Sequence, residues 1–198
     1  MAMIDLRNFA YCTMQVTPNS DGTETETLGT GKMSNQIINT DVKSGSSQQK
    51  LYAGGRVAKT ENNAIQGSGT VEFNFLPREN EAELLGHATE TKTVNTKSVT
   101  VITRKEDDKA PWVRWGIIKT ATENNVHKYV VEEYARTQFQ EPDKAGKTKG
   151  EKVDFGTLKL PCTYISSAED GSWERDVWCE DLATAQAELK DYCKVAEA

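Results

Sequence analysis

The sequence predicts a mainly β protein, a β-sandwich or partly open barrel with one flanking helix and a C-terminal helix. Apolar and polar residues alternate along several short segments, and this period of two is typical of strands. Polar, glycine-containing stretches separate those segments, as expected of turns. Helical signals occur at only two places, residues 77–86 and 181–193.

Residues 70–75 show the clearest alternation. We expect Val71, Phe73 and Phe75 to share the buried face of a strand there. The segments 112–118 and 128–134 are expected to pair as a hairpin across a turn near Asn124 and Asn125. Further strands are predicted at residues 6–12, 98–103, 153–160 and 162–165, and turns at residues 17–22 and 170–171.

Two long polar stretches lie between these strands. Residues 40–50 have Val42 as their one packing residue, so we expect an exposed loop or the tip of a long hairpin. The thirteen-residue stretch from Gln140 to Lys152 is lysine-rich, and we expect it to form a polar loop. Both stretches are therefore candidates for contacts with partners.

The two helical segments carry different signals. Residues 77–85 begin with proline and acidic side chains and are followed by Gly86, which matches helix-dipole and C-cap preferences. From Asp181, an expected N-cap, a thin apolar stripe runs along a second helix. A thin stripe needs a partner surface, so we predict docking on the sheet or on a neighbouring subunit. The predicted docking residues are Leu182, Leu189 and Tyr192.

Length and charge indicate one domain with an appendage. The 198 residues suit a single sandwich domain over 1–178, followed by an acidic helical extension over 179–198. The net charge of −6 belongs entirely to residues 169–198, which carry three basic and nine acidic side chains. Such an acidic end disfavours nonspecific adhesion to nucleic acid. The mean hydropathy of −0.65 leaves much surface for water or partner subunits.

Neither membrane insertion nor metal binding is predicted. No apolar stretch approaches the ~20 residues of a membrane span, and residues 1–7 lack the apolar region of a secretory signal, so we expect a soluble, intracellular start. The four cysteines are scattered singly, without the close pairs that zinc sites use. We therefore expect free structural thiols.

Phosphate-binding and nucleotide-binding motifs fail on their details. Lys32 lies in a glycine-containing run, but Met33 follows it where a phosphate loop needs a hydroxyl for Mg²⁺. Residues 67–69 precede a strand, whereas a dinucleotide fingerprint follows one.

Catalytic patterns are equally weak. His87 follows a helix-ending glycine, where a histidine helps to neutralise carbonyl groups, and His127 is expected to be exposed beside a turn. Glu132 and Glu133 should point to opposite faces of a strand and cannot act as an acid/base pair. No enzyme activity, cofactor or metal is predicted.

The order of several segments resembles the major tail protein (tail tube) family of siphophages over about residues 1–178. The matching segments are residues 51–55, the strand through Phe75, residues 82–87, residues 110–113, the hairpin with Lys128 and Tyr129, and residues 148–151 with 153–155. The chain departs from the family at Gly54, where members often carry Asp, and in the longer helical segment after Trp178.

This resemblance implies a structural virion protein without catalytic residues. Its β-sandwich subunits would assemble as hexameric rings that stack into a long non-contractile tail tube. The implied partners are further copies of the chain, tape measure protein, tail terminator and baseplate proteins. DNA would pass through the lumen at ejection without specific binding, and the protein would reside in the virion tail after assembly in the host cytoplasm.

We predict inter-ring or inter-subunit contacts at Asp41, Lys43, Lys50, Lys147 and Lys149. Two other classes stay open. One is a β-sandwich virion decoration or carbohydrate-binding adhesion module, which would be a monomer with an exposed aromatic cleft. The other is a small hydrolase whose triad joins His87 or His127 to a serine and an acid.

Overall fold

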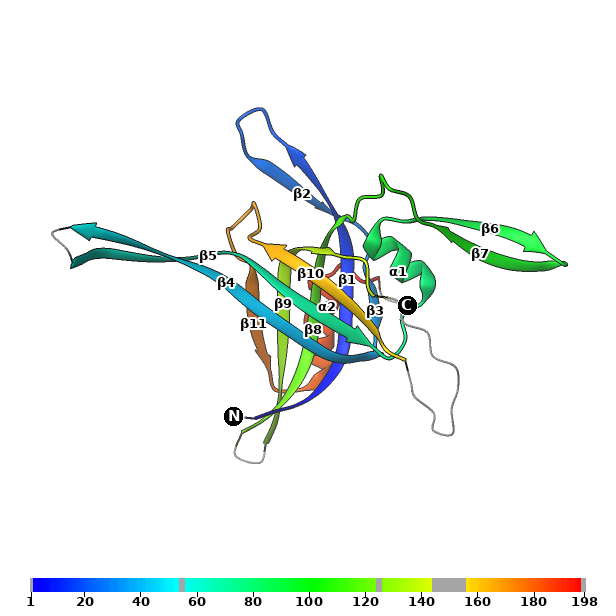
Figure 1. Ribbon diagram of the computed structural model, residues 1–198. Helices are drawn as coiled ribbons and strands as arrows, with labels where there is room; N and C mark the ends of the chain where they lie inside the picture. Colours follow the sequence, from blue (N-terminus) through cyan, green and yellow to red (C-terminus); the bar gives the residue numbers. More distant parts are fainter. Residues whose placement is uncertain (1, 54–55, 124–125, 144–155, 197–198) are drawn as a thin grey trace.

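The computed structural model describes residues 2–53, 56–123, 126–143 and 156–196, and the fold is mainly antiparallel β with two helices (Figure 1). The side chains of residues 2–4, 46–65 and 123 lie outside the description. The strands are β1 (Ala2–Pro18), β2 (Glu24–Leu28), β3 (Lys32–Ser34), β4 (Ile37–Ala53), β5 (Arg56–Phe73), β6 (Ala88–Val94), β7 (Lys97–Thr103), β8 (Trp112–Glu123), β9 (Val126–Phe139), β10 (Leu158–Ile165) and β11 (Glu174–Cys179). The helices are α1 (Arg78–Leu85) and α2 (Leu182–Tyr192).

One sheet makes up most of the molecule. Its strands follow the order β2-β1-β8-β9-β10-β5-β4, with β3 also on β1 and β11 also on β9. Strand β9 changes partner along its length, because residues 129–134 pair with β11 and residues 136–139 pair with β10. The sheet therefore curls, so that β4 comes close to β1. Within the described residues, no strand ladder joins β4 to β1. The result is a partly open barrel.

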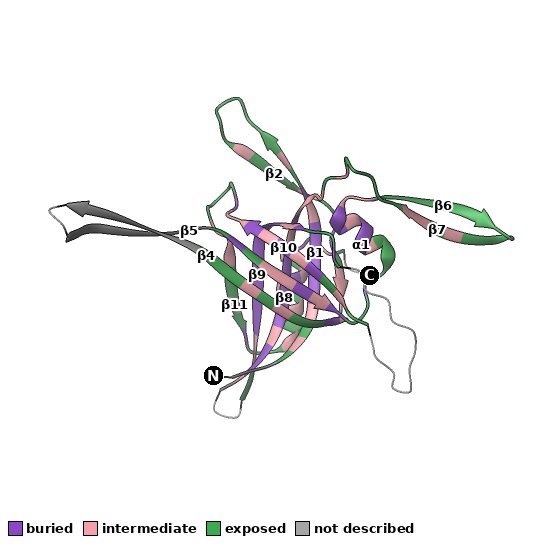
Figure 2. Cartoon of the chain, viewed as in Figure 1, coloured by how far each residue is buried: buried purple, intermediate pink, exposed green. Residues whose placement is uncertain are grey.

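Aromatic side chains fill the inside of this curled sheet. Figure 2 colours much of β1, β8 and β9 as buried. Trp115 is fully buried and stacks on Tyr134 with 4.3 Å between ring centroids. Phe9 meets Phe73 edge-on at 4.9 Å, so strands from both halves of the sheet meet in one cluster. Leu84 of α1 belongs to the same cluster. The interior is thus a packed core, which supplies most of the burial that stabilises the fold.

A second apolar cluster lies on the outer face of β1, β8, β9 and β11, under α2. Ile118 and Val131 of the sheet pack with Ala185, Leu189 and Cys193 of the helix and its cap, and these side chains are buried. Ala10, Cys179 and several half-buried residues complete the cluster. This helix therefore gives the sheet two buried faces along β8 and β9.

The backbone after α2 also hydrogen-bonds to the segment that joins β2 to β3. The Gly31 amide donates to the Lys194 carbonyl at 2.9 Å, and Gly31 forms a parallel bridge with Val195. A Cβ at position 31 would overlap the Cys193 carbonyl, so the close approach needs glycine. The predicted domain boundary at residue 178 falls one residue before the end of β11.

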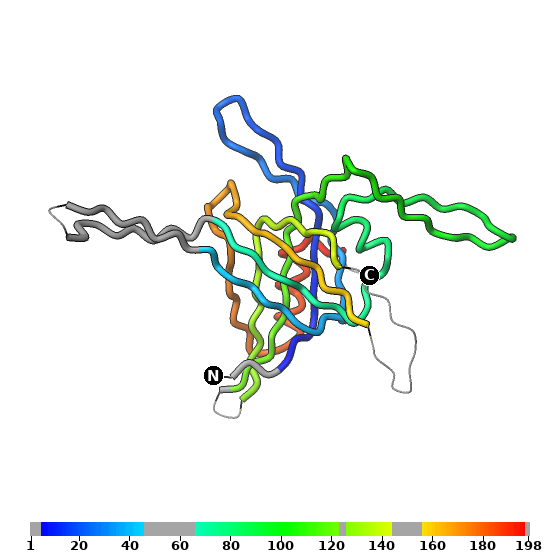
Figure 3. The backbone as a smooth tube through the Cα atoms, in the orientation of Figure 1, coloured from blue at the N-terminus to red at the C-terminus, as the bar shows by residue number. Residues whose placement is uncertain are grey.

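Three hairpins project from this body: β1–β2, β4–β5 and β6–β7 (Figure 1). Figure 3 traces the backbone of the β1–β2 and β6–β7 hairpins in full. In the β4–β5 hairpin, residues 37–53 pair with 56–73. Of the two alternatives for residues 40–50, the loop is wrong, whereas a long hairpin is present. This polar stretch forms one arm of that hairpin and not its tip. Cross-strand pairing satisfies its backbone groups, and polar side chains suit an arm that projects from the core.

Several other predictions are confirmed. Helix α1 begins after Pro77 and ends at Gly86, whose φ of 74° is left-handed. Strands β8 and β9 form the expected hairpin, with Thr122 opposite His127. Asp181 is the N-cap of helix α2, and its side chain accepts a hydrogen bond from the Thr184 amide at 2.8 Å. The turn at 170–171 is present, and all four cysteines are free and buried.

Other expectations need correction. Phe75 does not share the buried face with Val71 and Phe73, because β5 ends at Phe73 and Phe75 is 60% exposed. The two segments predicted on either side of Pro161 form one strand, β10. Strands β2, β3, β6 and β11 have no counterpart in the sequence-based expectations. The predicted loop from residue 144 onward and the predicted strand start at 153–155 lie outside the described residues.

Candidate functional site

The structure describes two of the five predicted contact side chains. Asp41 and Lys43 are exposed on β4 and form an ion pair with 3.2 Å between Oδ2 and Nζ. The backbone of Lys50 pairs with Thr60 in the β4–β5 hairpin, but its side chain lies outside the described part. Lys147 and Lys149 also lie outside the described residues. Only Asp41 and Lys43 are therefore shown to lie together.

The three predicted docking residues of α2 all face the sheet cluster. Leu189 is fully buried, and Leu182 and Tyr192 are half-buried against the same cluster. Gly116 of β8 makes this approach possible, because a Cβ there would meet Leu189 Cδ1 at 2.8 Å. The helix thus packs on the sheet of its own chain.

An ion pair between an exposed arginine and a buried glutamate fixes the same helix beside β11. Arg175 Nε of β11 donates to Glu133 Oε2 of β9 at 2.5 Å, and Arg175 Nη2 donates to Glu188 Oε1 of α2 at 2.9 Å. The Glu133 side chain is fully buried, and its Oε1 has no hydrogen-bond partner in the described chain. Burial raises the pKa of Glu133, while the bond from Arg175 acts in the opposite direction.

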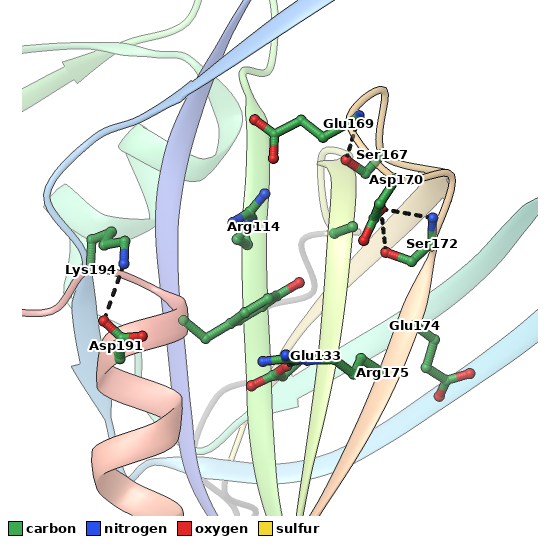
Figure 4. A pocket seen from close by; sticks show the side chains of 12 residues that line it. Arg114, Glu133, Ser167, Glu169, Asp170, Ser172, Glu174, Arg175, Asp191 and Lys194 are labelled. Carbon is green, nitrogen blue, oxygen red and sulfur yellow. Dashed lines mark hydrogen bonds and ion pairs between the residues drawn. The ribbon is translucent and has the colours of Figure 1, made fainter.

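This ion pair lines a polar pocket of about 260 Å³ at the end of α2 (Figure 4). The lining comes from β8, β9, β11, the 167–172 turn and the end of α2: Arg114, Glu133, Ala135, Ser167, Glu169, Asp170, Ser172, Glu174, Arg175, Asp191, Tyr192 and Lys194. The Arg114 guanidinium lies 5.2 Å from the centre of the Tyr192 ring, and Arg175 lies 5.6 Å from it. Tyr192 therefore contacts two cations.

Several charged groups of the pocket already pair within it. Lys194 Nζ lies 3.2 Å from Asp191 Oδ1, and Asp170 accepts from the Ser172 amide and hydroxyl. The Ser167 hydroxyl donates to Glu26, and no histidine lines the pocket. A serine nucleophile needs a base that takes its proton, and these serine hydroxyls donate to carboxylates in structural turns. The pocket is therefore a charged junction between α2 and the sheet.

His87 lies between two carboxylates. Its Nδ1 is 2.7 Å from Asp108 Oδ2, and its Nε2 contacts Glu141. Ionised carboxylates only accept hydrogen bonds, so the imidazolium form is the one that donates to both. Hydrogen bonds from the Lys105 amide and from His87 lower the pKa of Asp108. The ring thus bridges acidic groups, whereas the sequence predicted neutralisation of helix carbonyls.

The remaining catalytic candidates follow the sequence-based expectation. His127 is exposed, and its Nδ1 lies 3.3 Å from the Thr122 hydroxyl. Glu132 contacts Lys119 Nζ at 2.6 Å, whereas Glu133 contacts Arg175 on the α2 side. The two glutamates therefore lie on opposite faces of β9, as predicted.

Sequence reasoning missed the Glu133–Arg175 pair and the bridge made by His87. One signal for the first was present: Glu133 is a charged residue within a strand that is otherwise apolar on the α2 side. The partner could not be named, because β11 was not predicted. The second joins residues 54 positions apart in the chain, and no local pattern connects them.

Comparison with models of known protein families and with curated proteins found no match to this chain. Neither helix of the described chain has the length and apolar character needed to cross a membrane. Within the described ranges, no group of three or more His, Cys, Asp or Glu side chains is arranged to hold a metal ion.

Proposed function

We propose that this protein is a structural virion subunit that forms stacked hexameric rings in the tube of a long non-contractile phage tail. The ordered resemblance of residues 1–178 to siphophage tail tube proteins motivates the proposal. The observation that carries it is the set of three hairpins that leave the core (Figure 1). A compact monomer gains little from such projections, whereas a subunit of a larger assembly uses them as contact arms.

The β6–β7 hairpin supports this interpretation most directly. These two strands form their own two-stranded sheet, and every residue of β6 is exposed. An isolated two-stranded hairpin is marginally stable in water, because it has no core to pack against. Contacts with another subunit would supply the missing burial.

Open strand edges point the same way. Within the described residues, β4 pairs only with β5, and β11 pairs only with β9. Unpaired edges favour association with other strands unless they are protected. Contacts repeated around a closed ring would cover such edges, and a repeated contact between rings would extend the assembly into a tube.

Under this proposal the β4–β5 hairpin reaches the next ring. Asp41 and Lys43 lie exposed near its base, and Lys50, Lys147 and Lys149 would add further contacts. Tape measure protein, tail terminator and baseplate proteins would bind the assembled tube in the virion. A lumen without a net basic lining would let DNA slide through, because phosphates bind strongly only where Lys and Arg neutralise them.

The absence of catalytic work is part of the proposal. Both nitrogens of His87 face carboxylates, which leaves neither in a position to activate a hydroxyl. Of the two histidines that the hydrolase alternative could use, the more buried one is therefore not available as a catalytic base.

Negative-stain electron microscopy and light scattering on the purified full chain test this function. We expect hexameric rings or tubes that grow with protein concentration. A monomer at every concentration would overturn the proposal and favour the alternative of a virion decoration or carbohydrate-binding module.

Shortening the β4–β5 hairpin tests its role in stacking. Replacement of residues 46–64 by an Asn-Gly turn keeps the paired base of the hairpin. We expect single rings without tubes, and tubes of normal length would contradict the stacking role.

A further inference from the structure

Two aromatic side chains are exposed at opposite sides of the subunit. Phe75, just before α1, is 60% exposed, and Trp178, near the end of β11, is 51% exposed. In Figure 1, β11 lies at the left of the body, and α1 with β7 lies at the right. Large exposed aromatic side chains are enriched at protein–protein contacts, where their burial contributes much of the binding energy.

Phe75 lines a groove of about 750 Å³ between α1 and β7. The full lining is Phe75, Pro77, Arg78, Glu79, Thr100, Ile102 and Arg104. Phe75, Pro77 and Ile102 provide apolar surface for an inserted side chain. The groove therefore offers apolar surface beside an exposed aromatic residue.

Two arginines stand at this groove. Arg78 Nη1 donates to Glu81 Oε2 at 2.6 Å, and Arg104 Nη2 donates to Glu81 Oε1 at 3.2 Å. Glu81 is buried, whereas the Arg78 side chain is 71% exposed. An approaching partner therefore meets the guanidinium groups while the carboxylate that holds them stays beneath. Glu79 also lines the groove and accepts from the Thr100 hydroxyl at 3.4 Å.

Trp178 has the opposite electrostatic surroundings. Asp176 lies two residues earlier on the same face of β11, and Glu180 follows the strand. Burial raises the pKa of Asp176, and the nearby Glu132 carboxylate adds to this effect. Lys119 pairs with Glu132 and opposes this effect, so an approaching guanidinium would add to a compensation that is only partial.

We propose that Trp178 of one copy inserts into the Phe75 groove of a second copy, with Asp176 facing Arg78. This inference rests on the proposed function, because it names one contact through which the subunits associate. The two surfaces differ and lie on opposite sides, so the contact is heterologous and repeats from copy to copy. Such a contact closes a ring when the rotation fits and otherwise extends as a stack.

Alanine substitutions test the apolar part of this contact. We expect Trp178→Ala and Phe75→Ala each to weaken self-association at least tenfold in analytical ultracentrifugation of the full chain. Both side chains are exposed, so thermal unfolding monitored by circular dichroism should change little. The matched control is Val126→Ala, which trims a 57% exposed apolar residue at the start of β9 and should leave association unchanged.

Disulfide trapping tests the geometry without depending on fold stability. Copies with Asp176→Cys are mixed with copies carrying Arg78→Cys under mild oxidation. The four natural cysteines are buried, so they should not compete. We expect a cross-linked heterodimer only in the mixture, and Glu90→Cys on β6 in place of Arg78→Cys should give none.

The outcomes separate this contact from the proposed function. Normal rings from both alanine variants, together with no cross-link in the mixture, would overturn the Trp178 contact and leave the tube function standing. A wild-type chain that stays monomeric at every concentration would overturn both. Weakened association with a specific cross-link would establish the contact.

Discussion

The hairpins β8–β9 and β4–β5 share an antiparallel ladder and differ in what covers it. Residues 130–137 of β9 are buried on both faces, because the aromatic core lies on one side and α2 on the other. In β4, by contrast, Asp41 and Lys43 are exposed side by side. The comparison shows that pairing alone makes a strand, whereas packing on its faces decides how much the strand stabilises the protein.

The strongest way to break the comparison is to empty the core beside β9. Trp115→Ala removes a fully buried ring that stacks on Tyr134 and donates to the Thr137 hydroxyl at 2.9 Å. We expect the free energy of unfolding to fall by about 3–5 kcal/mol in urea titrations. The control Trp178→Ala, an exposed tryptophan, should cost under about 0.5 kcal/mol. Equal losses for the two variants would contradict the assignment of the core.

A second substitution, with a smaller expected effect, weakens the packing of α2 on the other face of β9. Leu189→Ala leaves a cavity between α2 and Gly116 and should cost about 3 kcal/mol in the same titration. Leu182→Ala, at a half-buried position on the same helix, should cost less. A loss below that of Leu182→Ala would mean that α2 does not seal this face.

The charge buried on that face makes stability depend on pH. The pKa of Glu133 is raised above its ordinary value of 4.5, so its contribution favours the fold below pH 4.5 and is lost as pH rises through the raised pKa. Glutamine never ionises. We therefore expect the unfolding free energy of Glu133→Gln, relative to wild type, to increase from about pH 4 toward neutral pH. Chemical denaturation at several pH values measures this slope, and a slope of opposite sign would contradict the buried position.

The control for this experiment is Glu188→Gln. Glu188 contacts the same Arg175 from the partly exposed side of α2. This variant therefore separates the loss of a contact to Arg175 from the loss of the buried carboxyl, because Glu133 is retained in it.

The smallest effect on stability is expected in the projecting hairpin. Lys43→Ala removes an exposed ion pair with Asp41 and should change the unfolding free energy by less than about 0.5 kcal/mol. Under the proposed function it should still reduce tube length in electron micrographs. A large loss of stability would mean that the arm packs on the core.

Local sequence patterns predicted the elements that have clear capping residues or a regular apolar face. Proline at the start and Gly86 at the end defined α1, and Asp181 with its apolar stripe defined α2. Period-two alternation could not reveal β4, because that hairpin arm is polar. The same alternation misplaced Phe75, since a strand's end depends on its partner and not on its own pattern.

The candidate sites were less predictable than the fold. Leu189 could be chosen from its spacing on a helix, and the structure places it in a buried cluster. The role of Glu133 depends on being enclosed by β11 and α2, which a single strand's sequence does not show. Lys50, Lys147 and Lys149 remain predictions, because the description does not reach their side chains.

The bonds between α2 and the first strands have a consequence for biosynthesis. Gln186 donates to Asn8 across 178 residues, and Gly31 meets Lys194. A ribosome adds roughly 5–20 residues per second, so β1 waits about ten seconds or longer before its outer cover is made. Throughout that interval the apolar surface that α2 later covers is exposed on the nascent sheet. Chaperone protection is therefore valuable during translation.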